Sequence, residues 1–370
     1  MNKSSKAFTI IELLIVIVII GILVAIVAVS YNGITKSAKE ASLKSDLKQA
    51  STQLELDKTK SISNQYPNTT SSLKSSNGAN LEISTSNNGT SYCLSATASP
   101  NLAFHITNTN TNPQEGVCPL EPIQNITKAQ CNTLPVYNAT NPTAIRTVTD
   151  NRGGTTRTYE IARLVDNNCW MLTNLKLGST TTTTALTPQD TNITANFTLP
   201  QVQTGGSVSS DNPTASGPVP GDTGSGATNY GYLYNWPSAT AGETSTSMPI
   251  GGGNAPHSIC PKNWRLPTGG TTGEFAMLNS KMNNPSAAAP SIQGGTGYYQ
   301  NWNYAGPFKG VIAGVWSNSF RNPTWGFLWS SSTSAGSSND ALGAFLSVSS
   351  VNPSSNYGRS IGFAVRCLLN

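Results

Sequence analysis

The first thirty residues constrain this chain more than any other stretch. A short basic leader ends at Ala7, and an almost unbroken apolar run follows from Phe8 to Val29. A helix of about 20 apolar residues is long enough to cross a bilayer. One carboxylate, Glu12, lies near the start of the run. Because a charge inside a membrane segment costs about 2.5–3.5 kcal/mol or more, we interpret Glu12 as a functional residue.

The order of leader and apolar run differs from that of a secretory signal, in which the cleavage site follows the apolar region. The run Lys6-Ala-Phe-Thr-Ile-Ile-Glu-Leu-Leu-Ile-Val-Ile resembles the type IV prepilin signal of bacterial pilins and type II secretion pseudopilins. The resemblance implies that a prepilin peptidase cleaves between Ala7 and Phe8, and that Phe8 is N-methylated. It also implies that Glu12 directs filament assembly. The apolar helix then remains in the mature protein.

A filament core made of such helices gives Glu12 a physical role. The free amine of Phe8 on one subunit is a cation, and Glu12 of a neighbouring subunit can neutralise it in one axial register. A half-made buried pair costs several kcal/mol, so packing out of register is penalised. The alternative is a plain membrane anchor in which the Glu12 side chain reaches the membrane surface.

The helix is predicted to continue to about residue 60, which gives a transmembrane and assembly helix over 8–60. Beyond Tyr31, apolar residues recur at spacings of three and four, with lysines on the opposite face. Residues 61–120 give short strand signals between Asn, Gly and Pro turns. This segment resembles the heads of small pilins through its Tyr-Cys-Leu and Gly-x-Cys motifs. We therefore expect a long helix packed on a small antiparallel sheet, the pilin fold.

Six cysteines follow the apolar helix, which suits an oxidising exterior. Six cysteines allow fifteen pairings. Their neighbourhood in the sequence favours three of these pairs: Cys93–Cys118, Cys131–Cys169 and Cys260–Cys367. None of the cysteines forms a Cys-x-x-Cys pair, so a zinc site is not expected.

Residues 121–370 are predicted to form a second, larger domain. All seven tryptophans lie beyond Cys131, and a disordered polar stalk would lack such large apolar groups. Tyr159 to Leu175 is predicted to form a hairpin, and Glu274 to Met282 a short helix. Residues 178–228 are rich in Thr, Gly and Pro, and we expect a long irregular loop there.

Several motifs in this region resemble the Fibrobacter succinogenes major paralogous domain over about residues 131–370. They are Asn168-Cys-Trp-Met171, Gly231-Tyr-Leu-Tyr-Asn-Trp236, Cys260-Pro-Lys-Asn-Trp-Arg-Leu-Pro-Thr268, Trp329-Ser-Ser-Ser332 and Gly362-Phe-Ala-Val-Arg-Cys367. The Trp-Arg-Leu-Pro-Thr element and the terminal motif are also similar to the formylglycine-generating-enzyme fold, a variant of the C-type-lectin-like fold. The resemblance implies a loop-rich α+β domain whose end strands meet, with Cys260–Cys367 tying them together.

The sequence does not indicate an enzyme. The two histidines, His105 and His257, fall in different predicted domains. His257 lies among Gly, Pro and Ser, and no sequence context gives it a nucleophile or an orienting acid. No cofactor is expected. Calcium is a weaker alternative, since Asp211, Asp222 and Asp340 lie in Gly/Ser/Asn-rich loops that can supply oxygen ligands. Such loop aspartates more often cap turns.

A dense aromatic stretch offers candidate ligand-facing side chains: Tyr298, Tyr299, Trp302 and Tyr304. Most such residues pack in a core, but one or two can line a surface groove that binds carbohydrate. The net charge of +5 falls to about +3 without the two leader lysines. That balance is too mild to indicate a nucleic-acid partner.

Together these features predict an α+β structural subunit of a type IV pilus or similar filament. The leader 1–7 is removed, the helix polymerises with copies of itself through the inner-membrane assembly machinery, and the C-terminal domain is displayed. The subunit is membrane-anchored first and then lies in an extracellular filament, where it contacts host or neighbour-cell glycans or proteins. Alternatives are a type II secretion pseudopilin, a minor tip pilin, and a membrane-tethered surface lectin or enzyme that does not polymerise.

Overall fold

The structure, a computed structural model, describes residues 10–67, 69–76, 78–86, 89–99, 102–138, 141, 144–204, 209–283, 293–294, 300–321, 324–348 and 350–370. The chain divides into two compact units, Met1–Pro119 (unit 1) and Leu120–Asn370 (unit 2). Both units contain helix and antiparallel strand, so the fold class is α+β, as the sequence predicts.

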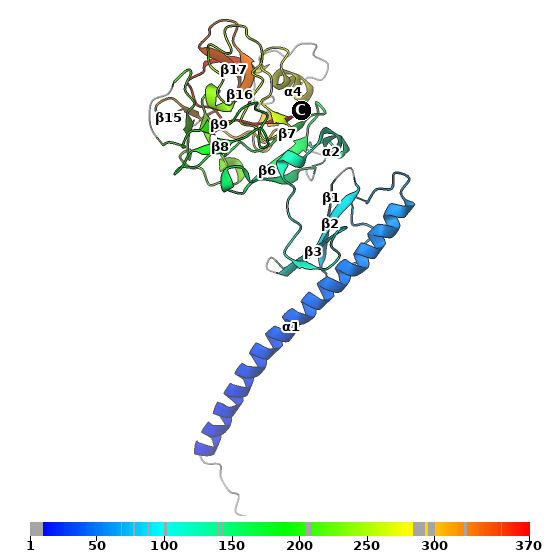
Figure 1. Ribbon diagram of the computed structural model, residues 1–370. Coiled ribbons are helices and arrows are strands. Elements are labelled where there is room, and N and C mark those ends of the chain that lie inside the picture. Colours follow the sequence, from blue (N-terminus) through cyan, green and yellow to red (C-terminus); the bar gives the residue numbers. More distant parts are fainter. Residues whose placement is uncertain are drawn as a thin grey trace, which may run out of the picture. The chain divides into compact units, whose positions relative to one another are not determined.

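Unit 1 combines one long helix with a small sheet (Figure 1). Helix α1 spans Ile10–Lys60. The sheet has the order β1-β2-β3-β4, with strands β1 (Asn80–Ser86), β2 (Ser91–Ser99), β3 (Leu102–Thr107) and β4 (Gln114–Glu115). Each strand pairs antiparallel with the next along the chain, so the sheet forms through short connections alone.

Apolar side chains from the second half of α1 and from the sheet form one buried cluster. The helix contributes Leu43, Leu47, Ala50 and Leu54, whose spacings of four and three place them on one face. The sheet contributes Tyr92, Leu94, Ala96, Phe104 and Ile106. Beside the cluster, the buried carboxylate of Asp46 accepts hydrogen bonds from Ser76 N at 2.9 Å and from Ser76 Oγ at 2.8 Å. These bonds fasten the connection that leads into β1.

The first half of α1 has the opposite character. The large apolar side chains described between Ile10 and Val24 are 47–84% exposed in the single chain. Within the part of the chain that the structure describes, no helix has the length and apolarity needed to cross a membrane. The membrane-spanning role of residues 8–29 therefore stays a prediction.

Unit 2 is built from short strands and long connections (Figure 1). One sheet has the order β12-β19-β7-β6-β5, with β5 (Arg146–Asp150), β6 (Arg157–Arg163), β7 (Cys169–Met171), β12 (Trp264–Arg265) and β19 (Leu368–Leu369). A second has the order β13-β18-β17-β16, with β13 (Gln293–Gly294), β16 (Trp325–Thr333), β17 (Asp340–Ser347) and β18 (Ser350–Gly358). Strands β14 (Val315–Trp316) and β15 (Phe320–Arg321) pair with each other.

Short helices connect these sheets. Among the described residues they are α2 (Lys128–Thr133), α3 (Trp236–Ala239), α4 (Glu274–Asn283) and the 3-10 turns η1 (Ile123–Asn125), η2 (Arg152–Gly154) and η3 (Gly226–Thr228). The helix predicted from Glu274 is α4. Strand β19 lies between β12 and β7, so the Trp-Arg segment meets the C-terminal strand within one sheet.

The structure corrects the long irregular loop predicted over residues 178–228. Within it, β8 (Thr184–Leu186) pairs with β9 (Phe197–Leu199). Further along, β10 (Ala215–Ser216) pairs with β11 (Leu233–Tyr234). Leu186, Leu199 and Ala215 are fully buried. Ile193, Ala195, Phe197 and Leu199 alternate with polar residues, so a strand signal of period two is present before and within β9. Strands β8 and β10 are shorter and lie among Thr, Gly and Pro without such a pattern.

Buried tryptophans hold the core of unit 2 together. Six of the seven are at most 1% exposed, and Trp325 is 43% exposed. The indole N–H groups of three of them donate to backbone carbonyls on distant segments. These bonds are Trp236 Nε1 to Ser330 O at 3.0 Å, Trp264 Nε1 to Ile123 O at 3.0 Å, and Trp329 Nε1 to Tyr234 O at 2.7 Å. Each ring therefore fills the core and also joins two loops.

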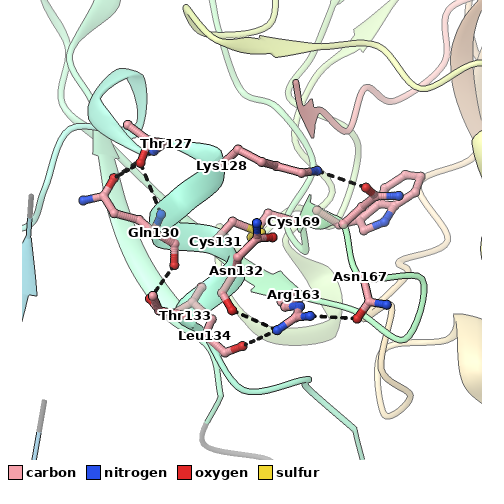
Figure 2. Close-up of a disulfide and its surroundings, with 12 residues drawn as sticks. Thr127, Lys128, Gln130, Cys131, Asn132, Thr133, Leu134, Arg163, Asn167 and Cys169 are labelled. Atoms are coloured by element: carbon pink, nitrogen blue, oxygen red, sulfur yellow. Dashed lines mark hydrogen bonds between the residues drawn. A yellow bond between two sulfur atoms is a disulfide. The ribbon is translucent and has the colours of Figure 1, made fainter. Parts of the chain in front are cut away.

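Three disulfides close the described chain: Cys93–Cys118 in unit 1, and Cys131–Cys169 and Cys260–Cys367 in unit 2. They are the pairs favoured by the sequence. Figure 2 shows how Cys131–Cys169 joins α2 to the start of β7. Beside it, Arg163 Nη1 donates to Asn132 O at 2.9 Å, and Arg163 Nη2 donates to Asn167 Oδ1 at 2.9 Å. A guanidinium thus satisfies a carbonyl at the C-terminal end of α2, where helix carbonyls lack partners.

The Trp-Arg-Leu-Pro-Thr motif fixes the start of α4. The Glu274 carboxylate accepts hydrogen bonds from Arg265, from Thr268 N at 2.7 Å and from Thr268 Oγ1 at 3.1 Å. Thr268 Oγ1 accepts in return from Glu274 N at 3.0 Å. Burial alone would raise the pKa of Glu274, but the hydrogen bonds from Arg265 and Thr268 outweigh it and lower that pKa below 4.5.

We predict that Cys260→Ser with Cys367→Ser destabilises unit 2 strongly. The pair closes a segment of 107 residues, for which the loop-entropy model gives about 4–5 kcal/mol. For a unit of this size that corresponds to a fall in Tm of roughly 10–20 °C. Differential scanning calorimetry of the oxidised protein measures the change. The matched control, Cys93→Ser with Cys118→Ser, should leave the transition of unit 2 in place. An unchanged Tm in the first variant would contradict the expectation.

We also predict that the stabilising effect of Glu274 depends on pH. Because its folded pKa lies below its ordinary value, its contribution is fully present above about pH 4.5 and disappears as the pH falls through the folded pKa. Glu274→Gln should lower the free energy of unfolding by about 1–2 kcal/mol at pH 7. This is the contribution of a charged hydrogen bond, reduced because the group is partly exposed. Urea unfolding at several pH values tests this. The difference from the parent should shrink in acid, whereas Glu82→Gln, at an exposed position of β1, should have little effect at any pH.

Candidate functional site

The processing and assembly residues predicted at the N-terminus are largely beyond the described structure. Ala7 and Phe8 lie outside the described residues. Glu12 lies within the first turns of α1, and its side chain is outside the description. Their predicted roles therefore rest on the sequence.

The predicted ligand-facing aromatics separate into three groups. Tyr298 and Tyr299 lie outside the described residues. Trp302 is fully buried, and its Nε1 donates to Asn279 Oδ1 at 2.8 Å, so it cannot face a ligand. Its ring packs 4.5 Å from that of Phe308. Tyr304 is 39% exposed and lines a surface hollow.

The hollow at Tyr304, called here the Tyr304 hollow, has a volume of about 220 Å³. It lies within unit 2 and combines side chains from β5, β6, η3 and the segment after residue 303. Its lining residues are Thr147, Thr158, Tyr159, Glu160, Leu172, Thr173, Ser225, Gly226, Asn229, Tyr304, Lys309, Val311 and Arg366.

One wall of the hollow is the outward face of strands β5 and β6. Thr147 lies directly opposite Glu160 in the ladder. The neighbouring residues Val148 and Tyr159 point into the core and are buried, whereas Thr147 and Thr158 are exposed. This alternation is the period of two that a strand imposes on its side chains.

The opposite wall presents Tyr304 and Lys309. Lys309 Nζ donates to Glu160 Oε2 at 2.7 Å and lies 5.3 Å from the centroid of the Tyr304 ring. Lys309 has a φ of 53°, a left-handed conformation that costs free energy in a non-glycine residue. The next residue must be a glycine, because a Cβ on Gly310 would lie 2.2 Å from Trp302 O.

A buried arginine supports the wall that carries Lys309. Arg366 is 0% exposed and donates from Nη2 to Lys309 O at 2.8 Å, and from Nε to Asn174 Oδ1 at 2.7 Å. Asn174 Nδ2 donates in turn to Tyr230 O at 2.9 Å. The segment carrying Asn229 and the segment carrying Lys309 are thus linked through one guanidinium. Burial lowers the pKa of Arg366 to about 9, so the group is still a cation at neutral pH.

Sequence reasoning missed most of this site. Glu160 belongs to the predicted hairpin, and its outward position follows from the alternation there. In the sequence, Lys309 and Arg366 stand out only because charged residues are scarce, at 11% of the chain. No local pattern brings β5, residue 229 and residue 309 together, because that proximity comes from the tertiary fold.

Two of the aspartates considered as calcium ligands, Asp211 and Asp222, each accept hydrogen bonds from different protein groups. Asp222 accepts from Lys176 Nζ at 2.9 Å and from Gly224 N at 2.8 Å, and Asp211 accepts from Ser245 N at 2.7 Å. These bonds to turn N–H groups are what loop aspartates commonly make. Over the described residues, no group of three or more His, Cys, Asp and Glu side chains is placed to hold a metal ion.

The histidine of unit 2 has a carboxylate partner. His257 Nδ1 lies 2.9 Å from Glu243 Oε1, and Ser247 Oγ donates to Glu243 Oε2 at 2.7 Å. The hydroxyl is bonded to the carboxylate and not to the imidazole, so these three groups do not form a nucleophile–base pair.

Comparison with protein-family models gives two matches. Residues 165–368, more than half of the chain, match the Fibrobacter succinogenes major domain. The chain belongs to this family. Residues 2–28 match the prokaryotic N-terminal methylation motif, which supports a type IV pilin-like surface or pilus subunit. Neither a curated protein nor a solved structure matches the chain significantly.

The family match covers the wall of the Tyr304 hollow that carries Tyr304 and Lys309, but not the wall formed by β5 and β6. Thr173, Asn229, Tyr304, Lys309 and Arg366 lie inside residues 165–368. The carboxylate of Glu160 and the hydroxyls of Thr147 and Thr158 come from strands that precede the matched region. Strands β5 and β6 therefore complete the hollow from outside the part of the chain that defines the family.

We predict that chelation leaves the stability of the protein unchanged. The hydrogen bonds of Asp211 and Asp222 come from protein groups alone, and they do not depend on an ion. Differential scanning calorimetry with EDTA and with added calcium should give the same Tm for unit 2. A rise in Tm with calcium that saturates would reveal a calcium site and refute the prediction.

Proposed function

We propose that this protein is the structural subunit of a type IV pilus-like filament that displays unit 2 for adhesion to host or neighbouring cells. The observation that carries the proposal is the N-terminal methylation motif on residues 2–28. It supports processing by a prepilin peptidase and polymerisation through the N-terminal helix.

The two halves of α1 support this proposal physically. Residues from Leu43 onward bury their apolar face against the sheet of unit 1, whereas those from Ile10 to Val24 are exposed in the single chain. A large exposed apolar surface indicates an interaction site. Burying each such side chain contributes about 1.5–3 kcal/mol, so a handful offsets the roughly 4–15 kcal/mol cost of association. Packing against the helices of other subunits would cover this surface.

Glu12 is the residue that this proposal makes essential. A carboxylate among packed apolar helices is costly unless it is paired, and the free amine of Phe8 on a neighbouring subunit is the proposed partner. The pair would select one axial register among the many that apolar packing alone permits. A secretion pseudopilin or a tip subunit would use the same contact, and its location in the cell would distinguish it.

We predict that Glu12→Ala abolishes filaments while the protein still reaches the membrane fraction. Removing the carboxylate leaves the Phe8 amine buried without a partner, at a cost of several kcal/mol per subunit. Electron microscopy and quantification of sheared surface filaments measure the outcome. Glu40→Ala on the same helix is the control. Glu40 and Lys36 form a surface ion pair at 3.9 Å, and such a pair contributes little stability. Normal filaments from Glu12→Ala would contradict the proposal.

A further inference from the structure

We infer that the Tyr304 hollow binds one neutral sugar residue of a surface glycan. The inference deepens the proposed adhesive function and rests on it for its biological meaning. Four properties of the hollow carry it: an accessible aromatic ring, unused hydrogen-bonding groups, balanced charge and small size.

The first property is the exposed ring. Tyr304 is 39% exposed, and Leu172 and Val311 add apolar lining to the hollow. A tyrosine presents an apolar ring face together with a polar hydroxyl. A sugar ring likewise has an apolar face formed by its C–H groups and an edge formed by its hydroxyls.

The second property is the set of polar side chains around that ring. Among the described residues, no hydrogen bond uses the side chains of Thr147, Thr158 or Asn229, although all three line the hollow. Hydroxyl and amide groups both donate and accept. Glu160 accepts and Lys309 donates, so the hollow offers both functions to a ligand whose hydroxyls also do both. Polar groups placed in this way give orientation and specificity.

The third property is charge. Besides Arg366, the cation Lys309 lines the hollow, and Glu160 neutralises it at 2.7 Å. The N–H groups of Arg366 are directed to Asn174 and to the carbonyls of Phe308 and Lys309, so they are not available to an anion. A nucleic acid or other polyanion needs unpaired cations, and the hollow does not offer them.

The fourth property is size. Pockets for drug-sized ligands measure about 300–1,000 Å³, and this hollow measures about 220 Å³. It therefore accommodates one sugar residue and not an extended peptide. The hydrogen bonds from buried Arg366 to Lys309 O and to Asn174 Oδ1 hold the Lys309 segment in place before any ligand arrives, which reduces the entropy cost of binding.

Saturation-transfer NMR on the detergent-solubilised full-length chain tests the inference. The probes are methyl β-D-glucoside, methyl β-D-galactoside, methyl α-D-mannoside and N-acetyl-D-glucosamine, with glucuronate as the anionic comparison. At least one neutral probe should bind saturably. Tyr304→Ala should weaken it by about tenfold, the effect of losing a central aromatic contact. Tyr304→Phe keeps the ring and should stay within about twofold.

Trp325→Ala is the matched control, because Trp325 is 43% exposed and does not line the hollow. It should bind as the parent does, and Thr147→Val should bind several-fold more weakly. Absence of binding by every neutral probe, binding that survives Tyr304→Ala, or binding of glucuronate alone would each overturn the inference. Because the assay does not require filaments, a failure of polymerisation leaves its result interpretable, and a negative result here leaves the filament proposal standing.

Discussion

The structure of unit 2 depends on the buried indole N–H that donates to a distant carbonyl. Long connections expose backbone groups that neither a helix nor a sheet satisfies, and burying them without partners costs free energy. Trp236, Trp264 and Trp329 each satisfy one such carbonyl while filling the core with a large ring. The Trp264 bond joins the middle of unit 2 to η1 near its beginning, at a separation of 141 residues. A chain with only 11% charged residues can therefore be loop-rich and still well packed.

Buried arginines also donate hydrogen bonds to backbone carbonyls of the loops. Arg366 bonds to the carbonyls of Phe308 and Lys309, and Arg359 bonds to those of Thr244 at 3.0 Å and Met248 at 2.7 Å. Each guanidinium also lies over an aromatic ring, Phe308 or Trp236, at 4.6 and 4.4 Å from the ring centroid. Five fixed donors make arginine suited to collecting carbonyls from several loops. One of these arginines, Arg366, also lines the Tyr304 hollow.

The sequence allows prediction of features that depend on a local pattern of residues or on residue types with a characteristic role, such as cysteine. The helical spacing of Leu43, Leu47, Ala50 and Leu54 predicts that one face of α1 packs against another element. The neighbourhood of the cysteines in the sequence indicates the disulfide pairs. Within 178–228, the alternation of Ile193, Ala195, Phe197 and Leu199 is a strand signal that the Thr-, Gly- and Pro-rich surroundings obscure, whereas Leu186 in β8 carries no period. The Tyr304 hollow escapes prediction for another reason. Thr147, Asn229 and Lys309 are ordinary surface residues in the sequence, and only tertiary contacts bring them together.

Strand β19 lies in the interior of its sheet, between β12 and β7, although it consists of residues 368–369. Its neighbours β7 and β12 are made 100 to 200 residues earlier in the chain. Synthesis proceeds at about 5–20 residues per second, so these strands wait for roughly 5–40 seconds without the partner that completes them. Unit 1, whose strands pair in chain order, has no such delay. The two units therefore differ in folding order: unit 1 can fold during synthesis, while unit 2 closes around its final strand only after residue 369 has been made.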